Sequence, residues 1–203
     1  MNTLLVLASG SPRRSRILSE AGIAFEPVPP RAEEIGLPGE TPADMVVRLA
    51  GQKAREVADR VGPNRWVLGV DTVVAIDDHI LGKPTDEAHA TQMLLRLSGR
   101  THSVYSGFAI VGFGEEHTGV DETRVTMRPI TLVEAAAYSA TGEPLDKAGA
   151  YAIQGEAIEF ITSVVGSRRN VAGLPLEALM PLLAARGIPT GSGATDTSDA
   201  NGP

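Results

Sequence analysis

The opening of this 203-residue chain constrains its fold more than any other stretch. Leu4 to Ala8 is a short, unbroken aliphatic run, which is typical of a strand buried on both faces. Ser9 and Gly10 then favour a turn. Ser11-Pro12 is a typical helix start, because the serine hydroxyl can accept from a backbone N–H of the first turn and proline fits the first helical position. The pattern predicts a buried strand that leads directly into a helix.

The predicted junction also has the features of an anion site. A helix N-terminus presents free N–H groups, and Gly10 permits close approach to the backbone. Arg13 and Arg14 add two guanidinium groups, so a phosphate matches the stretch best. However, serine, glycine and proline also occur in such turns for capping alone, and exposed arginines commonly face water. This stretch by itself leaves both interpretations open.

Strand and helix signals alternate along the rest of the chain and predict an α/β fold with a mixed sheet. Predicted strands lie at 25–28, 66–70, 73–76, 79–81, 101–111, 123–127 and 160–165. Predicted helices begin at Pro12, Pro42, Thr85 or Asp86, Thr131 and Leu176. From Thr190 onward no apolar residue is larger than alanine, so we expect one domain over 1–189 and a disordered tail over 190–203.

Several isolated charged residues need an explanation. Lys53 lies on the apolar stripe of its predicted helix, either as a snorkelling side chain or as an ammonium directed into a phosphate pocket. Asp71 separates two apolar runs, where it either caps a turn or belongs to a site at a strand end. Lys83 is held between Gly82 and Pro84, and Glu33-Glu34 forms a carboxylate pair in a predicted loop.

Composition and missing motifs exclude several classes of function. A formal net charge of −7 argues against non-specific binding to nucleic acid or anionic membrane. The chain has no cysteine and no long apolar segment, so we expect a soluble, cytoplasmic protein without a disulfide or a thiol nucleophile. It also lacks the dinucleotide, P-loop, zinc-protease and serine-hydrolase motifs. The remaining cations and carboxylates suit a phosphate ester and a divalent metal.

Six ordered blocks resemble the Maf (septum formation) family of nucleoside triphosphate pyrophosphatases. They begin at Ser9, Gly69, Leu81, Leu97, Asp146 and Gly173 and read SGSPRR, GVDTVV, LGKP, LSGRTH, DKAGAY followed by IQG, and GLPL. The resemblance covers roughly residues 3 to 185. It implies a fold like that of the inosine triphosphate pyrophosphatases, with an elongated mixed sheet, flanking helices and a cleft between two lobes, commonly in a homodimer. It also implies hydrolysis of a nucleoside triphosphate to a monophosphate and pyrophosphate.

The resemblance also implies roles for individual residues. Asp71 would be the general base and, with Glu34, would hold a divalent cation, Mg²⁺ or Mn²⁺. Ser9, Arg13, Lys53 and Lys83 would hold the triphosphate, and the two lysines are also counted as catalytic. Ser11 is a further substrate-binding residue. Arg14, Thr72 and Gln154 match the positions that the dTTP/UTP-cleaving branch uses for base selection, whereas the 7-methyl-GTP branch differs there. We therefore expect dTTP and UTP as substrates. The alternatives are a regulatory nucleotide-binding protein in division arrest and a phosphatase that releases orthophosphate.

Overall fold

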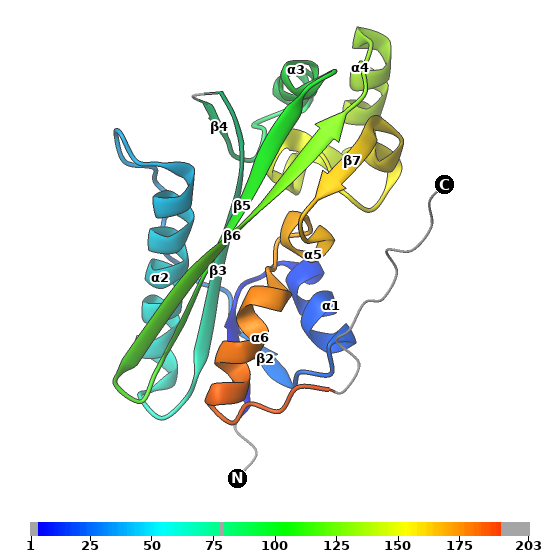
Figure 1. Cartoon of the computed structure of the whole chain (residues 1–203). Coiled ribbons are helices and arrows are strands. Elements are labelled where there is room, and N and C mark those ends of the chain that lie inside the picture. Colours follow the sequence, from blue (N-terminus) through cyan, green and yellow to red (C-terminus); the bar gives the residue numbers. More distant parts are fainter. Residues whose placement is uncertain (1–3, 78, 192–203) are drawn as a thin grey trace.

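A computed structural model describes residues 4–77 and 79–191, which form a mixed α/β structure around one sheet (Figure 1). The strand order is β2-β1-β3-β5-β6-β7, and β4 also pairs with β3. Pairing of β1 with β2 and β3 is parallel, and the other pairs are antiparallel. The predicted mixed sheet is confirmed. Residues 192–203 of the predicted tail lie outside the described residues, whereas the Gly191 amide donates to the Ala21 carbonyl at 3.0 Å.

The sequence signals locate most elements to within a few residues. The strands are β1 Leu5–Ala8, β2 Phe25–Pro27, β3 Val67–Ile76, β4 His79–Leu81, β5 Thr101–Gly112, β6 Glu115–Met127 and β7 Ile161–Val165. The helices are α1 Pro12–Glu20, α2 Pro42–Val61, α3 Glu87–Leu97, α4 Leu132–Ala140, α5 Arg168–Val171 and α6 Leu176–Ala185, with short 3-10 turns η1 Glu143–Asp146, η2 Ala148–Ala150 and η3 Glu156–Phe160. No helix in the described part of the chain is long and apolar enough to cross a membrane.

Strand β3 divides one face of the sheet between two hydrophobic cores. Leu68 and Val70 pack in a core with α1 and α6, whereas Val74 and Ile76 pack in a second core with α3 and α4. Figure 1 shows these two pairs of helices toward opposite ends of the long strands. Because side chains alternate along a strand, Thr72 lies on this same face, between the two cores. The divide between the cores leaves room for a cleft.

Helix α2 covers the other face of the sheet and packs closely against it. Thr41 caps the helix by accepting from the Asp44 amide, as its sequence predicts. Glycines on the facing strands allow the close approach, because a Cβ at Gly69 would lie 2.1 Å from the Ala50 carbonyl oxygen and one at Gly107 would lie 2.4 Å from backbone carbon of Val46. This contact places the middle of α2 directly over the middle of β3.

The predicted break between two strands at Asp71 and Thr72 is wrong. Strand β3 is continuous, because β5 pairs with it from Val67 to Ala75. On its other edge, β3 pairs with β1 at 67–69 and with β4 at 74–76. In the described chain, residues 70–73 therefore have a partner strand on one side alone. The gap between the β1 and β4 pairings leaves an opening beside β3, and Asp71 lies next to this opening in the middle of the strand.

His102, in β5, makes stability dependent on pH. The residue is 3% exposed, and Nε2 of its ring lies 2.7 Å from the Tyr151 hydroxyl. Burial lowers the pKa of His102 from 6.5 to about 4. An unfolded chain takes up a proton at this residue below about pH 6.5, whereas the folded chain resists it until about pH 4. The stabilisation is therefore complete above pH 6.5 and is lost as pH falls toward 4.

We expect His102 alone to lower the free energy of unfolding by about 3 kcal/mol between pH 7 and pH 4. Urea titrations at a series of pH values measure this slope. A His102→Gln variant retains a polar partner for the tyrosine but lacks the titrating ring, so its stability should fall less steeply over the same range. Equal slopes for the two proteins would contradict a buried neutral histidine.

Candidate active site

A cleft of about 980 Å³ lies at the opening beside β3, between the two cores. Its walls come from the β1–α1 junction, α2, β3, the segment after β4, and the segments around η1, η2 and α5. Every site residue predicted from the sequence lines this cleft: Ser9, Ser11, Arg13, Arg14, Glu34, Lys53, Asp71, Thr72, Lys83 and Gln154. The structure thus brings together groups that lie up to 145 positions apart, from 9 to 154.

Lys53, Asp71 and Glu34 form an ionic cluster on one wall. The Lys53 ammonium lies 2.6 Å from Oδ1 of Asp71 and 2.8 Å from Oε1 of Glu34. The side chains of Lys53 and Asp71 are each 5% exposed, and that of Glu34 is 48% exposed. The snorkelling interpretation of Lys53 is therefore wrong, because its ammonium is buried and pairs with the carboxylate of the neighbouring strand. The ion pair with Lys53 compensates the charge of Asp71, so this carboxylate can lie inside the sheet.

The surrounding cations keep Glu34 ionised. Partial burial raises the pKa of Glu34, but pairing with Lys53 and the charges of Lys83 and Arg14 outweigh it and lower this pKa below the usual value. Within the described chain, Oδ2 of Asp71 makes no hydrogen bond with another side chain, so it remains available to a ligand. Both carboxylates thus present oxygen acceptors to the cleft.

These two carboxylates suit a divalent cation that a ligand helps to bind. Mg²⁺ is commonly held by one or two protein carboxylates, with phosphate oxygens and water completing its shell. Among the described residues, no group of three or more His, Cys, Asp or Glu could hold a metal ion on its own. Asp71 and Glu34 fit Mg²⁺ or Mn²⁺ on the condition that phosphate groups supply further oxygens.

The β1–α1 junction differs from its prediction in one contact. The Ser11 side chain makes no capping hydrogen bond, although Pro12 begins the helix as expected. The Ser9 hydroxyl instead accepts from the Ser11 amide at 3.2 Å and from Nη1 of Arg14 at 3.1 Å. Because both of these bonds use its oxygen, the Ser9 proton is free to donate to a ligand such as a phosphate oxygen.

The two arginines of α1 have different surroundings. Arg14 bridges three segments, since Nε donates to the Gly173 carbonyl at 2.8 Å and Nη2 donates to the Thr72 hydroxyl at 3.3 Å, in addition to its bond to Ser9. Burial lowers the pKa of Arg14, while the charges of Asp71 and Glu34 oppose the change. Arg14 is thus an organising group of the cleft as well as a part of its lining.

Arg13 turns toward η1, where sequence analysis assigned no site residue. Its Nη1 lies 3.0 Å from Oδ2 of Asp146, and Lys147 pairs with the other oxygen of the same carboxylate. Partial burial raises the pKa of Asp146, but Lys147 and Arg13 outweigh it and lower this pKa. Asp146 and Lys147 line the cleft. In the sequence they open the DKAGAY block, which carried no role for either residue.

Lys83 and Gln154 lie at the rim of the cleft with exposed side chains.

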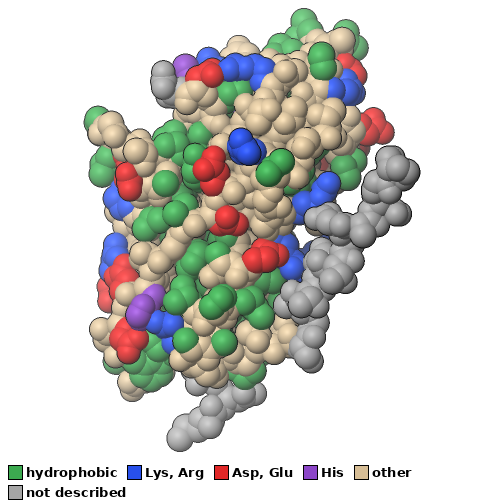
Figure 2. Space-filling view, viewed as in Figure 1, with side chains coloured by type: hydrophobic (Ala, Val, Ile, Leu, Met, Phe, Trp, Pro, Cys, Tyr) green, Lys and Arg blue, Asp and Glu red, His purple; other side chains and the backbone are tan. Residues whose placement is uncertain are grey.

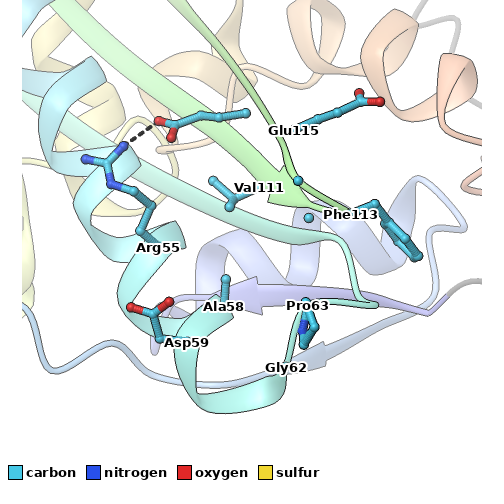
Figure 3. A pocket seen from close by; sticks show the side chains of 11 residues that line it. Arg55, Ala58, Asp59, Gly62, Pro63, Val111, Phe113 and Glu115 are labelled. Atoms are coloured by element: carbon cyan, nitrogen blue, oxygen red, sulfur yellow. Dashed lines mark hydrogen bonds and ion pairs between the residues drawn. The ribbon is translucent and has the colours of Figure 1, made fainter.

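A second, smaller pocket of about 420 Å³ lies elsewhere, between the end of α2 and the β5–β6 turn (Figure 3). An Arg55–Glu116 ion pair of 2.5 Å crosses its wall, and it contains none of the predicted site residues. On the face in Figure 2, basic and acidic side chains are interspersed. The predicted groups therefore converge on the larger cleft.

The buried Lys53–Asp71 pair, the carboxylate of Glu34 and the nearby cations define an α/β protein with a charged cleft that suits an anionic ligand. The chain belongs to the Maf-like protein family, whose family model matches residues 4–186. A dTTP/UTP pyrophosphatase of Symbiobacterium thermophilum is 46% identical over 93% of this chain and 97% of its own length. Another, from Myxococcus xanthus, is 49% identical over 92% of this chain and 94% of its own. The resemblance to the family is confirmed.

Solved structures give a more distant likeness. A nucleoside-triphosphatase described as a dITP/XTP pyrophosphatase from Mycobacterium abscessus is 22% identical, with a TM-score of 0.44. The similarity covers 91% of this chain and 96% of that chain. A HAM1 protein from Coxiella burnetii is 20% identical with a TM-score of 0.49, over 90% of this chain and 99% of that chain.

Proposed function

We propose that this protein hydrolyses dTTP and UTP to the nucleoside monophosphate and pyrophosphate. Relatives named dTTP/UTP pyrophosphatase, at 46% and 49% identity over almost the whole chain, support the reaction and the substrates. The observation that carries the proposal is the Lys53–Asp71–Glu34 cluster at 2.6 and 2.8 Å, in a cleft of about 980 Å³ that also holds Arg13 and Lys83. Such a cleft offers both a proton acceptor and charge neutralisation to a triphosphate.

In this proposal Asp71 activates the attacking water. Lys53 holds Oδ1, so Oδ2 can accept the proton as the water oxygen bonds to the α-phosphorus. The bond from that phosphorus to the α–β bridging oxygen then breaks, and pyrophosphate leaves with the electron pair. Arg13 and Lys83 neutralise the charge on the departing phosphates, and the Ser9 hydroxyl donates a hydrogen bond to them. Ser11 contacts the substrate at the N-terminus of α1.

A divalent cation completes the proposed site. Asp71 and Glu34 would hold it together with the substrate, and it would supply additional neutralisation of phosphate charge. Arg14, Thr72 and Gln154 form the part of the cleft that we assign to the base. This division gives the arginine pair separate roles, with Arg13 toward phosphate and Arg14 toward base selection.

The experiment that tests this function is a product analysis. Purified protein is incubated with a panel of nucleoside triphosphates and Mg²⁺ or Mn²⁺, and pyrophosphate and orthophosphate are assayed separately. We expect UTP and dTTP to yield equal amounts of monophosphate and pyrophosphate. Tight binding without turnover would favour the regulatory alternative, and orthophosphate as the main product would favour a phosphatase.

Three further features belong to the proposal. The domain spans residues 1–189, and it acts as a homodimer, as the resemblance to the family implies. It works in the cytoplasm, where nucleoside triphosphates are made and used. Its small-molecule substrate requires a local cationic pocket, which the Arg13 and Lys83 wall supplies within a chain of net charge −7.

A further inference from the structure

A chain of hydrogen bonds leads from the cleft into the protein interior. Nη2 of Arg14 lies 3.3 Å from the Thr72 hydroxyl, which lies 2.8 Å from the Ser106 hydroxyl. Ser106 in turn donates to the main-chain carbonyl of Asn170 at 3.1 Å. Thr72 lines the cleft, whereas Ser106 is 0% exposed and reaches the cleft through Thr72 alone. The network ends in a group that can only donate, the Arg14 guanidinium, and in a group that can only accept, the Asn170 carbonyl.

The two ends of this network favour one direction for every bond. A guanidinium can only donate and a carbonyl can only accept, so protons run from Arg14 to Thr72, from Thr72 to Ser106, and from Ser106 to Asn170. If Ser106 donated to Thr72 instead, the Thr72 proton would turn to the Gly173 carbonyl at 3.4 Å. In both arrangements the Thr72 proton stays within the protein. When Thr72 donates to Ser106 at 2.8 Å, its oxygen accepts from Arg14 alone and keeps one lone pair for a ligand.

We infer that Ser106 is a positioning residue for base selection, because it makes Thr72 an acceptor and not a donor toward the base. This inference rests on the proposed function and on the placement of the base beside Thr72. Uracil and thymine carry a ring N–H at position 3, whereas the same nitrogen in cytosine is a bare acceptor. An acceptor at Thr72 therefore bonds uracil and thymine, and it leaves two acceptors facing each other when cytosine is present.

The test compares kcat/KM for UTP and CTP in the wild type and in Ser106→Ala. Removing the Ser106 oxygen leaves the Thr72 proton with only the 3.4 Å contact to Gly173, so it can turn into the cleft and donate to cytosine. We expect the UTP-to-CTP ratio to fall about tenfold, mainly through better use of CTP. Ser106→Thr retains a hydroxyl and should retain the ratio.

Ser139→Ala is a matched control, since Ser139 is also 0% exposed and bonds Thr91 at 3.0 Å, away from the cleft. Its ratio should equal that of the wild type. An unchanged ratio in a folded Ser106→Ala protein would overturn the inference while leaving the proposed function intact. Failure of the wild type to release pyrophosphate from UTP would instead remove the proposed function.

A second measurement needs no variant. The triphosphate of 2-pyrimidinone riboside has the bare ring nitrogen of cytosine but lacks the amino group. If Thr72 reads the ring N–H, the wild type should use this analogue as poorly as CTP. Use of the analogue as efficiently as UTP would show that cytosine is excluded through its amino group, and the inference would be overturned.

Discussion

Replacing Asp71 by asparagine is expected to lower kcat for UTP by about 10³-fold. The amide occupies the same space and can still accept from Lys53 through its oxygen, but it cannot take a proton from water. Glu34 keeps its 2.8 Å contact with Lys53, so the cluster should stay assembled. Nucleotide affinity measured without a divalent cation should change little, because the cations Arg13, Lys53 and Lys83 remain. Single-turnover kinetics and calorimetric titration with a non-hydrolysable UTP analogue measure the two quantities separately.

A matched control for this change is Asp77→Asn. Asp77 also pairs with a cation, Arg100 at 2.7 Å, but its side chain is 57% exposed and it does not line the cleft. Its turnover should equal that of the wild type. Rates near the wild-type value in Asp71→Asn would contradict the role of Asp71 as the general base. Another group in the cleft would then have to accept the proton.

Replacing Lys53 by methionine should cost about 3–5 kcal/mol in the free energy of unfolding. Methionine retains most of the apolar stem, but Asp71, with its side chain 5% exposed, loses its only ion-pair partner among the described residues. A buried carboxylate without a partner is far more costly than the pair was favourable. Urea denaturation at pH 7 gives the value directly.

Arg55→Met removes one partner of an exposed ion pair and serves as the comparison. Arg55 and Glu116 lie 2.5 Å apart with side chains 48% and 36% exposed, so the loss should stay below about 1 kcal/mol. Adding Asp71→Asn to Lys53→Met should recover part of the lost stability, since the double variant no longer buries a lone charge. Equal stabilities of the Lys53 and Arg55 variants would contradict the account of the buried pair.

Local signals predicted the elements well where short-range chemistry decides them. Thr41 and Asp44 identify the start of α2, and Thr131 with Glu134 makes the capping box that opens α4. The apolar run of β1 likewise predicts a strand with four buried residues. In each case the deciding contacts join residues that are close in sequence, so the pattern alone contains the information.

Predictions failed where a distant residue decides the outcome. Asp71 suggested the end of a strand, because a lone carboxylate is costly inside a sheet, but Lys53 on α2 compensates its charge. Helix α1 has no side-chain cap from Ser11, and the junction is instead held by Ser9, which accepts from the Ser11 amide and from Arg14. Strand β5 supplies the pairing that keeps β3 continuous, and no local pattern shows it.

The candidate site was predicted through its family blocks more than through its geometry. All the named residues line one cleft. The contacts between them were not predictable, since Arg13 meets Asp146 and Thr72 meets Ser106 across 133 and 34 positions of sequence. Serine and asparagine at 106 and 170 carry no motif of their own. Their importance follows from burial and hydrogen-bond direction, which require coordinates.

The central claim is that water attacks the α-phosphorus of the nucleotide. Hydrolysis of UTP in water enriched in ¹⁸O, followed by mass spectrometry of the separated products, tests it directly. The account predicts one ¹⁸O atom per molecule of UMP and unlabelled pyrophosphate. Label in pyrophosphate with none in UMP would place the attack on the β-phosphorus, and labelled orthophosphate would place it on the γ-phosphorus; either result would contradict the account.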